Sequence, residues 1–436
     1  FGSSRHSGSR SAFRTMVCFS AWGACIILHS VHLASATYGP KGFPMPPDTR
    51  PAGCPRKVKG KTLETVSMVI PYLSEKWEHM QATVLSILHF TPEELIEQII
   101  FVSDGNKNPR KEQLEALSPK LQVLVLPKRA GLIRAKMRGA ELATAPIILF
   151  MEPHCVVNRR WLEPLIDHVM DNPQTMAMPV LDAISQSNFA DYQRAALGHF
   201  RLEWNFNLIY VNPHGETDSP EPFPSPATSG GILAMRRDWF EHLELFDTGL
   251  RQWGGDQVEL TMKGWRCGDN SRIMIIPCSR VGHMFRDADN QPYPVKVDMV
   301  VKNYARVAAT WTDNHLSTFF KVKPEAQYIN IGDVSSLLDQ RESLGCRDMD
   351  WYLRNVDFEM GWESSRVCIP GADVLENNGC SGDAAPARST IDQIMPTETY
   401  LRAKAMSARG EDASEIFEES DLGGILEDED EDDEEL

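Results

Sequence analysis

The feature that most constrains the fold is an alternation of two sequence patterns between residues 65 and 170. Short apolar runs bounded by polar or turn residues are typical of buried strands, and the longer amphipathic segments between them are typical of helices. The sequence predicts strands at residues 66–71, 98–102, 121–126 and 147–151, and helices at about 76–89, 110–117, 131–143 and 161–170. Because strands that alternate with such helices pair in parallel, we predict an α/β fold with a mostly parallel central sheet and helices on both faces.

The pattern changes after Pro179, where the chain becomes irregular and rich in Trp, Pro and Gly. This composition predicts a second half that is built from loops and short strands and binds the substrate. Neither a G-x-G-x-x-G sequence nor a Walker sequence occurs in the chain. A dinucleotide-binding fold and a P-loop are therefore not supported.

The strand predicted at residues 147–151 is followed at once by Glu152-Pro-His154. Residues two apart along a strand point to the same side, and ligands of open α/β sheets bind at the carboxyl ends of the strands. Glu152 and His154 would then face one site, and a carboxylate with an imidazole is half of a site for a divalent cation. Such a pair is more often structural than metal-binding, so the motif alone leaves both interpretations open.

Negative charge is concentrated at the C-terminal end. The formal net charge is −17, and residues 411–436 hold 15 acidic and no basic residues, so the rest of the chain carries a charge of −2. A chain without a basic surface is not expected to bind nucleic acid. The acidic run at residues 427–435 has too few apolar side chains to form a core, so we predict that residues 411–436 are a disordered, solubilising tail.

The N-terminal residues resemble a targeting signal. Residues 1–15 form a short basic segment, and the apolar stretch at residues 16–36 is long enough for a membrane anchor. Ala34-Ser35-Ala36 also resembles a signal-peptidase site, so a signal anchor and a cleaved signal peptide both stay open, with a buried core helix less favoured. Positively charged residues that flank an anchor stay on the cytoplasmic side of the membrane, so the basic segment at residues 1–15 predicts that the rest of the chain is lumenal. Residues 37–57 are rich in Pro and Gly and predict a stem.

Cysteine usage fits an oxidising compartment. No C-x-x-C pattern of a zinc site occurs, and we interpret Cys155 as a buried small side chain rather than a metal ligand. Two other cysteines lie in the apolar stretch, which leaves an even number that can pair: Cys54, Cys267, Cys278, Cys346, Cys368 and Cys380.

Several segments, in order, resemble the polypeptide N-acetylgalactosaminyltransferases, the family that begins mucin-type O-glycosylation. They are Lys128-Arg-Ala-Gly-Leu-Ile-Arg-Ala-Lys-Met-Arg-Gly-Ala140, Glu152-Pro-His-Cys155, Trp161-Leu-Glu-Pro-Leu165, Ser229-Gly-Gly-Ile232, Trp253-Gly-Gly-Asp-Gln257, Trp265-Arg-Cys-Gly268, Pro277-Cys-Ser-Arg-Val-Gly-His283, Arg306-Val-Ala-Ala-Thr-Trp311, and Cys346 with Trp351-Tyr-Leu-Arg-Asn355. The resemblance predicts a catalytic domain at residues 58–360, followed by an extension at residues 361–410. The family's C-terminal ricin-type lectin domain is not evident after Asn355.

The resemblance implies a GT-A fold and a Mn²⁺-dependent, retaining glycosyltransferase that moves N-acetylgalactosamine from UDP to Ser or Thr of a polypeptide. The implied partners are a UDP-sugar donor and a polypeptide acceptor. The implied location is the Golgi membrane, as a single-pass type II protein with a lumenal catalytic domain, or the lumen of the secretory pathway if the N-terminal segment is cleaved. The resemblance also implies the disulfides Cys54–Cys278 and Cys267–Cys346, and Cys368 with Cys380 is a third expected pair.

The family's functional residues correspond to positions of this chain. The metal ligands correspond to Glu152, His154 and His283. The other matches are nucleotide or diphosphate contacts at Asp104, Arg129, Lys136 and Arg286, a mobile-loop tyrosine at Tyr293, and the sugar-site loop at Trp253 and Asp256, and we take Asp256, Trp253 and Arg286 as catalytic. Each has a structural alternative, which is core packing for Trp253, an ordinary turn for Asp256 and a salt bridge for Arg286.

Several positions depart from the family's pattern. They are Glu152 for Asp, Asp256 for Glu, Lys136 for Arg, Leu73 for His and Pro71 for Thr. One hypothesis is that the opposite changes at Glu152 and Asp256 compensate for each other. The departures keep two alternatives open: a related glycosyltransferase with another UDP-sugar or acceptor, and a non-catalytic homologue that binds peptide or assists a partner enzyme.

Overall fold

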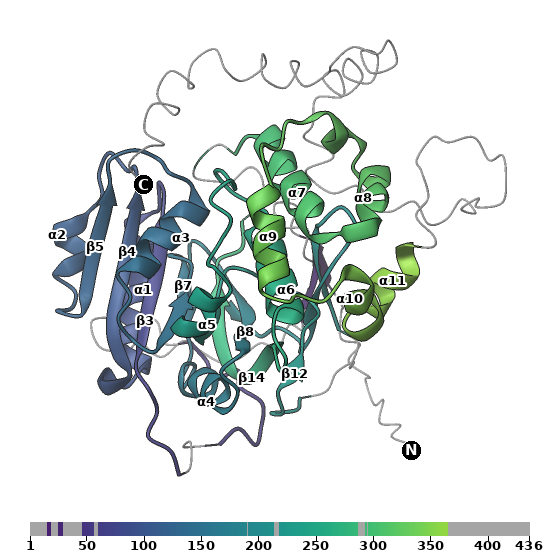
Figure 1. The fold of residues 1–436 in the computed structure, drawn as a ribbon. Helices are drawn as coiled ribbons and strands as arrows, with labels where there is room; N and C mark the ends of the chain where they lie inside the picture. The colour runs from purple at the N-terminus through teal and green to yellow at the C-terminus, as the bar shows by residue number, and fades with distance from the viewer. Residues whose placement is uncertain are drawn as a thin grey trace, which may run out of the picture.

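A computed structural model of the chain describes residues 15–18, 25–28, 46–55, 60–189, 191–212, 218–286, 293 and 295–364 (Figure 1). The strands of the main body are β3 (Val66–Tyr72), β4 (Ile96–Asp104), β5 (Leu121–Leu126), β6 (Ile147–Phe150), β7 (Cys155–Val157), β8 (Thr175–Ile184), β9 (Tyr192–Gln193), β10 (His199–Leu202), β11 (Leu208–Val211), β12 (Phe223–Pro224), β13 (Leu233–Arg236) and β14 (Arg272–His283). The helices are α1 (Trp77–Phe90), α2 (Lys111–Glu115), α3 (Leu132–Glu141), α4 (Glu163–Asp171), α5 (Arg237–His242), α6 (Asp256–Arg266), α7 (Val297–Trp311), α8 (Leu316–Val322), α9 (Ser335–Ser343), α10 (Met349–Asn355) and α11 (Phe358–Ser364).

One central sheet runs through the molecule in the order β12-β14-β8-β13-β6-β3-β4-β5. Its strands are apolar on both sides because each face is covered. Val66, Met68 and Ile70 of β3 pack into the core that includes α1 and α4. Val69 of the same strand packs into the opposite core with α3, α6 and α7. The predicted α/β fold with helices on both faces is therefore confirmed.

The first half of the sheet matches the sequence prediction closely. The strands β3, β4, β5 and β6 and the helices α1 to α4 all form where they were expected, with β5 at the predicted residues and the others within a few residues. β6, β3, β4 and β5 pair in parallel. Alternation of apolar runs with amphipathic segments was thus enough to predict this half.

The second half differs from the expectation of loops and short strands. β14 has 12 residues and α7 has 15, so this half contains some of the longest elements of the fold. β14 runs parallel to β8 but antiparallel to β7, and β13 lies antiparallel between β6 and β8. The sheet is consequently mixed: along the main path of its described strands, four pairings are parallel and three are antiparallel.

The N-terminal part of the chain, before the central sheet, is described only in parts. At the start of the predicted anchor and within it, the described residues form two short antiparallel strands, β1 (Thr15–Cys18) and β2 (Cys25–Leu28). Among the residues that the structure describes, no helix has the length and apolar character needed to cross a bilayer. Residues 46–55, inside the predicted stem, contact the sheet: Thr49 is buried and its Oγ1 donates to Asp182 Oδ2 at 2.5 Å. The acidic tail and most of the C-terminal extension lie outside the described residues.

Both disulfides that the resemblance implied are present. Cys54 pairs with Cys278 at a Cα–Cα distance of 5.6 Å, and Cys267 pairs with Cys346 at 4.1 Å. The first bond joins the segment before the domain to β14, and the second joins the end of α6 to the chain before α10. Cys368 and Cys380 lie outside the described residues. Cys155 is free and buried, as we interpreted it.

We expect each disulfide to stabilise the fold by about 2–4 kcal/mol, because a bond between distant residues restricts the unfolded chain. Replacing Cys267 and Cys346 together by serine should lower the free energy of unfolding by that amount, measured by urea denaturation under non-reducing conditions. The control is the wild-type protein in dithiothreitol, which should unfold at still lower urea because both bonds are then lost. Equal urea midpoints for the oxidised wild type and the variant would contradict the prediction.

Candidate active site

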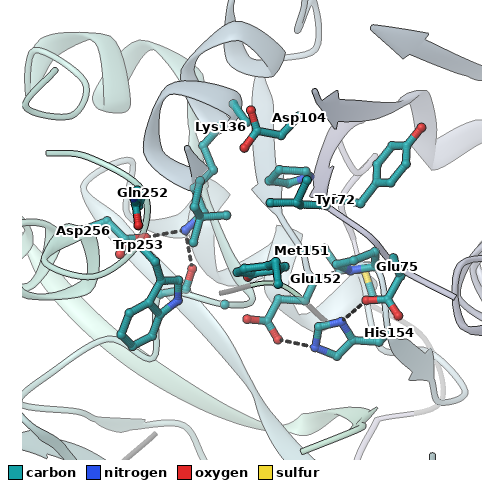
Figure 2. A pocket seen from close by; sticks show the side chains of 18 of the residues that line it. Tyr72, Glu75, Asp104, Lys136, Met151, Glu152, His154, Gln252, Trp253 and Asp256 are labelled. Carbon is teal, nitrogen blue, oxygen red and sulfur yellow. Dashed lines mark hydrogen bonds and ion pairs between the residues drawn. The ribbon is translucent and has the colours of Figure 1, made fainter. Parts of the chain in front are cut away.

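A cleft lies at the carboxyl ends of β3, β4 and β6, where the alternating pattern predicted a ligand site. Its empty volume of about 890 Å³ includes the open mouth. In Figure 2, Gln252, Trp253 and Asp256 lie on one side of the cleft and Glu75 and His154 on the other, with Glu152 between them. The predicted site residues that line it are Asp104, Arg129, Lys136, Glu152, His154, Trp253, Asp256, Arg286 and Tyr293.

His283 completes a group with Glu152 and His154 at the edge of this cleft. The register of β7 and β14 pairs Cys155 with His283, so strand pairing brings this distant histidine beside the Glu-x-His turn. Glu152 Oε2 contacts His283 Nε2 and lies 3.3 Å from His154 Nε2. Thr83 of α1 supports the turn from below, because its Oγ1 accepts a hydrogen bond from the Cys155 amide at 2.9 Å.

The three side chains have the geometry of a site for a divalent cation. One ligand atom from each residue lies within 4.8 Å of the others, a spacing that fits one shared ion with metal–ligand distances near about 2.0–2.3 Å. Burial lowers the pKa of the His283 imidazole, which favours the neutral form that binds metals. Burial alone would raise the pKa of Glu152, but the His283 and His154 rings outweigh it and keep the carboxylate charged.

Glu75 is a candidate site residue that the sequence patterns did not indicate. It follows the end of β3, and its buried carboxylate accepts hydrogen bonds from His154 Nδ1 at 3.0 Å and His79 Nδ1 at 2.9 Å. Arg286 donates to both of its oxygens at 2.7 and 2.6 Å. Burial alone would raise the pKa of Glu75, but these partners hold it well below its usual range. A carboxylate on the far nitrogen of a ligand histidine orients the ring.

The end of β4 forms a second polar region of the cleft. Asp104 Oδ1 accepts a hydrogen bond from the Ala130 amide at 2.6 Å, and its Oδ2 accepts one from the Gly131 amide at 3.1 Å. The Arg129 guanidinium lies 5.4 Å from the centre of the Tyr293 ring. Burial raises the pKa of Asp104, and burial raises the pKa of Tyr293 to about 12. The predicted nucleotide residues Asp104, Arg129 and Tyr293 are therefore close together.

Lys136 and Asp256 form a buried ion pair in the cleft wall. Lys136 Nζ lies 2.6 Å from Asp256 Oδ2, and it donates to the Gly230 carbonyl oxygen at 3.0 Å. Both side chains are about 5% exposed. The neighbouring Gly231 lies against Glu152, because a Cβ at this glycine would be 3.0 Å from the carboxylate. The two positions that depart from the family in opposite directions, 152 and 256, are thus linked through Lys136 and the two glycines.

Trp253 lies in a turn that leads into α6. The turn needs unusual backbone angles, because Gln252, Gly254 and Gly255 have φ values of 51°, 91° and 93°. Glycine is required at the last two positions, since other side chains rarely adopt such angles. The structure places Trp253 at the cleft, although part of its surface also packs against the core.

The remaining departures also face the cleft. Pro71 and Leu73, at and just after the end of β3, line the same space as Asp104. Neither side chain can donate a hydrogen bond, so this part of the wall offers apolar surface. Arg286 forms a salt bridge with Glu75, which is the structural role expected as an alternative to a catalytic one. Its side chain also lines the cleft.

Comparisons with known proteins found similar chains. A family model described as Glycosyl transferase family 2 matches residues 67–244. Polypeptide N-acetylgalactosaminyltransferase 10 of Rattus norvegicus is 35% identical over 372 residues, which are 83% of this chain and 61% of that protein. Inactive polypeptide N-acetylgalactosaminyltransferase-like protein 5 of Macaca fascicularis is 34% identical over 320 residues, 71% of each chain. The chain thus spans about three fifths of the rat protein's length.

A solved structure is also similar. The crystal structure of GalNAc-T7 with UDP, GalNAc and Mn²⁺ superposes with a TM-score of 0.64 at 27% identity, and the match covers 70% of this chain and 59% of that chain.

Proposed function

This chain belongs to the polypeptide N-acetylgalactosaminyltransferase family and has a GT-A fold, and on that premise we propose that it is a retaining glycosyltransferase. It would move N-acetylgalactosamine from UDP to Ser or Thr of a polypeptide. One observation carries this proposal: three kinds of group lie at one cleft. They are the group of Glu152, His154 and His283, the Asp104 carboxylate at the end of β4, and the buried Lys136–Asp256 ion pair.

The donor set supports Mn²⁺ as the cation. One carboxylate and two imidazoles suit a borderline-hard divalent metal, and diphosphate oxygens would complete its coordination. His283 Nε2 faces the Glu152 carboxylate, as a second ligand of a shared cation would, and within the described residues the buried Nδ1 of the same ring has no hydrogen-bond partner. When bound, the ion would act as a Lewis acid that neutralises charge on the departing UDP.

The chain's own residues have distinct roles in this proposal. Asp104 and Arg129 would hold the nucleotide, and Arg286 would neutralise the diphosphate. Glu75 would keep Arg286 and His154 aimed into the cleft. On the opposite side, Trp253 would cover the sugar and the Lys136–Asp256 pair would form its polar wall.

A second candidate is a non-catalytic family member that binds peptide or assists a partner. Two observations favour it: the departures at Glu152, Asp256 and Lys136 all lie in the cleft, and one of the similar proteins is itself named inactive. A small positional error at a catalytic site can cost about 100-fold in rate. The two candidates differ in turnover, not in fold.

The deciding experiment measures UDP release from a panel of UDP-sugars, with and without a Ser/Thr peptide and with Mn²⁺ or a chelator. The proposal expects Mn²⁺-dependent release that is fastest with UDP-N-acetylgalactosamine and increases with peptide. Release with another UDP-sugar would point to the related transferase. Binding of UDP by calorimetry without any release would support the non-catalytic candidate.

We further propose that the catalytic domain is in the lumen of the secretory pathway, anchored as a type II Golgi protein by the N-terminal segment. The two disulfides support an oxidising compartment, because such bonds are rare in the cytosol. Protease protection in intact microsomes tests this topology, and a domain that is digested without detergent would contradict it.

The proposed compensation between positions 152 and 256 makes a further prediction. Because Lys136 and the Gly230–Gly231 backbone link the two carboxylates, we expect Glu152→Asp and Asp256→Glu to each reduce transfer, and the double variant to lose less than the two losses combined. Initial rates with UDP-N-acetylgalactosamine measure this for all four proteins. If the fold-loss of the double variant equals the product of the two single fold-losses, compensation is ruled out.

A further inference from the structure

The turn that carries Trp253 is held by one side chain of α7. Asn303 is fully buried, and its Nδ2 lies 2.6 Å from the carbonyl oxygen of Arg251, 3.0 Å from that of Trp253 and 2.9 Å from that of Gly254. Its Oδ1 accepts a hydrogen bond from the Arg251 amide at 3.0 Å. The amide orientation follows from this set, because a flipped group would place oxygen against three carbonyl oxygens.

The turn needs such support because its backbone is strained. Gln252 has a φ of 51° although it is not glycine, and residues in sparsely populated regions persist only where their surroundings over-determine them. A second contact holds the other side, where the Gln252 carbonyl oxygen accepts a hydrogen bond from the Leu132 amide at 2.7 Å. Leu132 begins α3, which carries Lys136. The turn is therefore fixed between α7 and α3.

The beginning of the same loop is held by a charged side chain one helical turn further along α7. Arg306 Nε and Nη2 lie 2.5 and 3.1 Å from the two carboxylate oxygens of Asp247, and its Nη1 donates to the carbonyl oxygens of Ile331 and Asp333, both at 2.8 Å. A Cβ on Gly249 would be 2.3 Å from Arg306 Nε, so the backbone approaches the guanidinium closely. Arg306 anchors the loop, whereas Asn303 sets the conformation of its turn.

We propose that Asn303 is a positioning residue, which holds the 251–254 turn so that Trp253 lies against the sugar side of the cleft. This inference rests on the proposed function and adds to it a residue that does not touch the ligand. The nucleotide end, around Asp104 and Arg129, lies on other elements, where Asp104 accepts hydrogen bonds from the Ala130 and Gly131 amides and makes none with Asn303. Asn303 should therefore affect the sugar and its transfer, and not the binding of UDP.

The informative variant is Asn303→Asp, which keeps the shape and the acceptor but loses the donor to three carbonyl oxygens. Amide hydrogen exchange in residues 247–255 should become at least about tenfold faster. The wild type should bind UDP-N-acetylgalactosamine more tightly than UDP, and this difference should become smaller in the variant. The Kd of UDP itself should stay within about twofold of the wild-type value. The kcat of transfer should fall by about 100-fold, because a displacement of about 1 Å at a reacting group has that cost.

The matched control is Thr312→Val at the end of the same helix, where a buried side chain donates to the Ala308 carbonyl oxygen at 2.7 Å. It loses one hydrogen bond without contact to the turn, and it should leave exchange in residues 247–255, UDP-sugar affinity and kcat unchanged. The proposal is overturned if Asn303→Asp keeps wild-type exchange and wild-type sugar affinity, or if it weakens UDP as much as UDP-sugar. If the wild type transfers no sugar, the proposed function fails. The role of Asn303 is then still decided by two measurements, the amide hydrogen exchange of residues 247–255 and the affinity for UDP-N-acetylgalactosamine.

Discussion

Replacing His283 by alanine is expected to reduce sugar transfer by about 1000-fold. The residue contributes one of three ligand atoms that lie within 4.8 Å of one another. A metal supplies several kcal/mol of charge stabilisation, and about 4 kcal/mol corresponds to about three powers of ten in rate. The rate of transfer from UDP-N-acetylgalactosamine at saturating Mn²⁺ measures the effect, and calorimetric titration with Mn²⁺ in the presence of UDP should show weaker binding by the variant.

The control for this experiment is His89→Ala, which removes an exposed histidine of α1 that is not in the cleft. It should bind Mn²⁺ and transfer sugar like the wild type. Mn²⁺ affinity that is unchanged in His283→Ala would show that this histidine is not a ligand. The binding measurement remains decisive even if the wild type proves to be non-catalytic.

Replacing Lys136 by methionine is expected to lower the free energy of unfolding by about 3–5 kcal/mol. The substitution keeps most of the side chain's volume but leaves the buried Asp256 carboxylate without its partner at 2.6 Å. Breaking a buried ion pair costs more than the pair contributes, because one charge stays buried and uncompensated. Urea denaturation followed by circular dichroism measures the loss.

Two further variants test that explanation. The double variant Lys136→Met with Asp256→Asn should recover part of the stability, since no isolated charge is then buried. Arg138→Met, on the same helix, breaks the exposed pair with Glu141, whose atoms are 2.8 Å apart, and it should change stability by about 0–1 kcal/mol. A loss below about 1 kcal/mol in Lys136→Met would mean that the cleft solvates Asp256 well enough without the amine.

The sequence predicted the first half of the sheet because its signals are local. β5 formed at the predicted residues, since an apolar run between polar flanks needs no distant partner to be recognised. β14 was missed because Pro277 and Arg280 interrupt its apolar run, and its pairing with β8 shifts register between Ile276 and Arg280. The direction of β13 depends on the strands on either side of it, which no short sequence pattern specifies.

The helix α7 was missed for a different reason. Its apolar residues recur at spacings of three and four, so a helix was detectable, but we assigned the entire region after Pro179 from its composition. Asn303 and Arg306 therefore had no element on which to be placed.

The site shows the same division between local and distant information. The strand end alone indicated Glu152 and His154 as half of a possible cation site, with a structural interpretation still open, whereas His283 needed the family resemblance, since only the pairing of β14 with β7 brings it close. Glu75 was missed because a glutamate between a strand and a helix is ordinary in sequence. Its importance comes from the histidines and the arginine that surround it in space.

The bond between Cys54 and Cys278 has a consequence for the order of events during biosynthesis. Its cysteines are 224 residues apart, and ribosomes add about 5–20 residues per second. The Cys54 thiol must therefore wait at least roughly 10–45 seconds for its partner to be made. β14, which carries Cys278 and His283, is made in the same interval. A nascent chain that paired Cys54 with another thiol in that time would need a disulfide isomerase before the strand that carries His283 could be joined to its native partner.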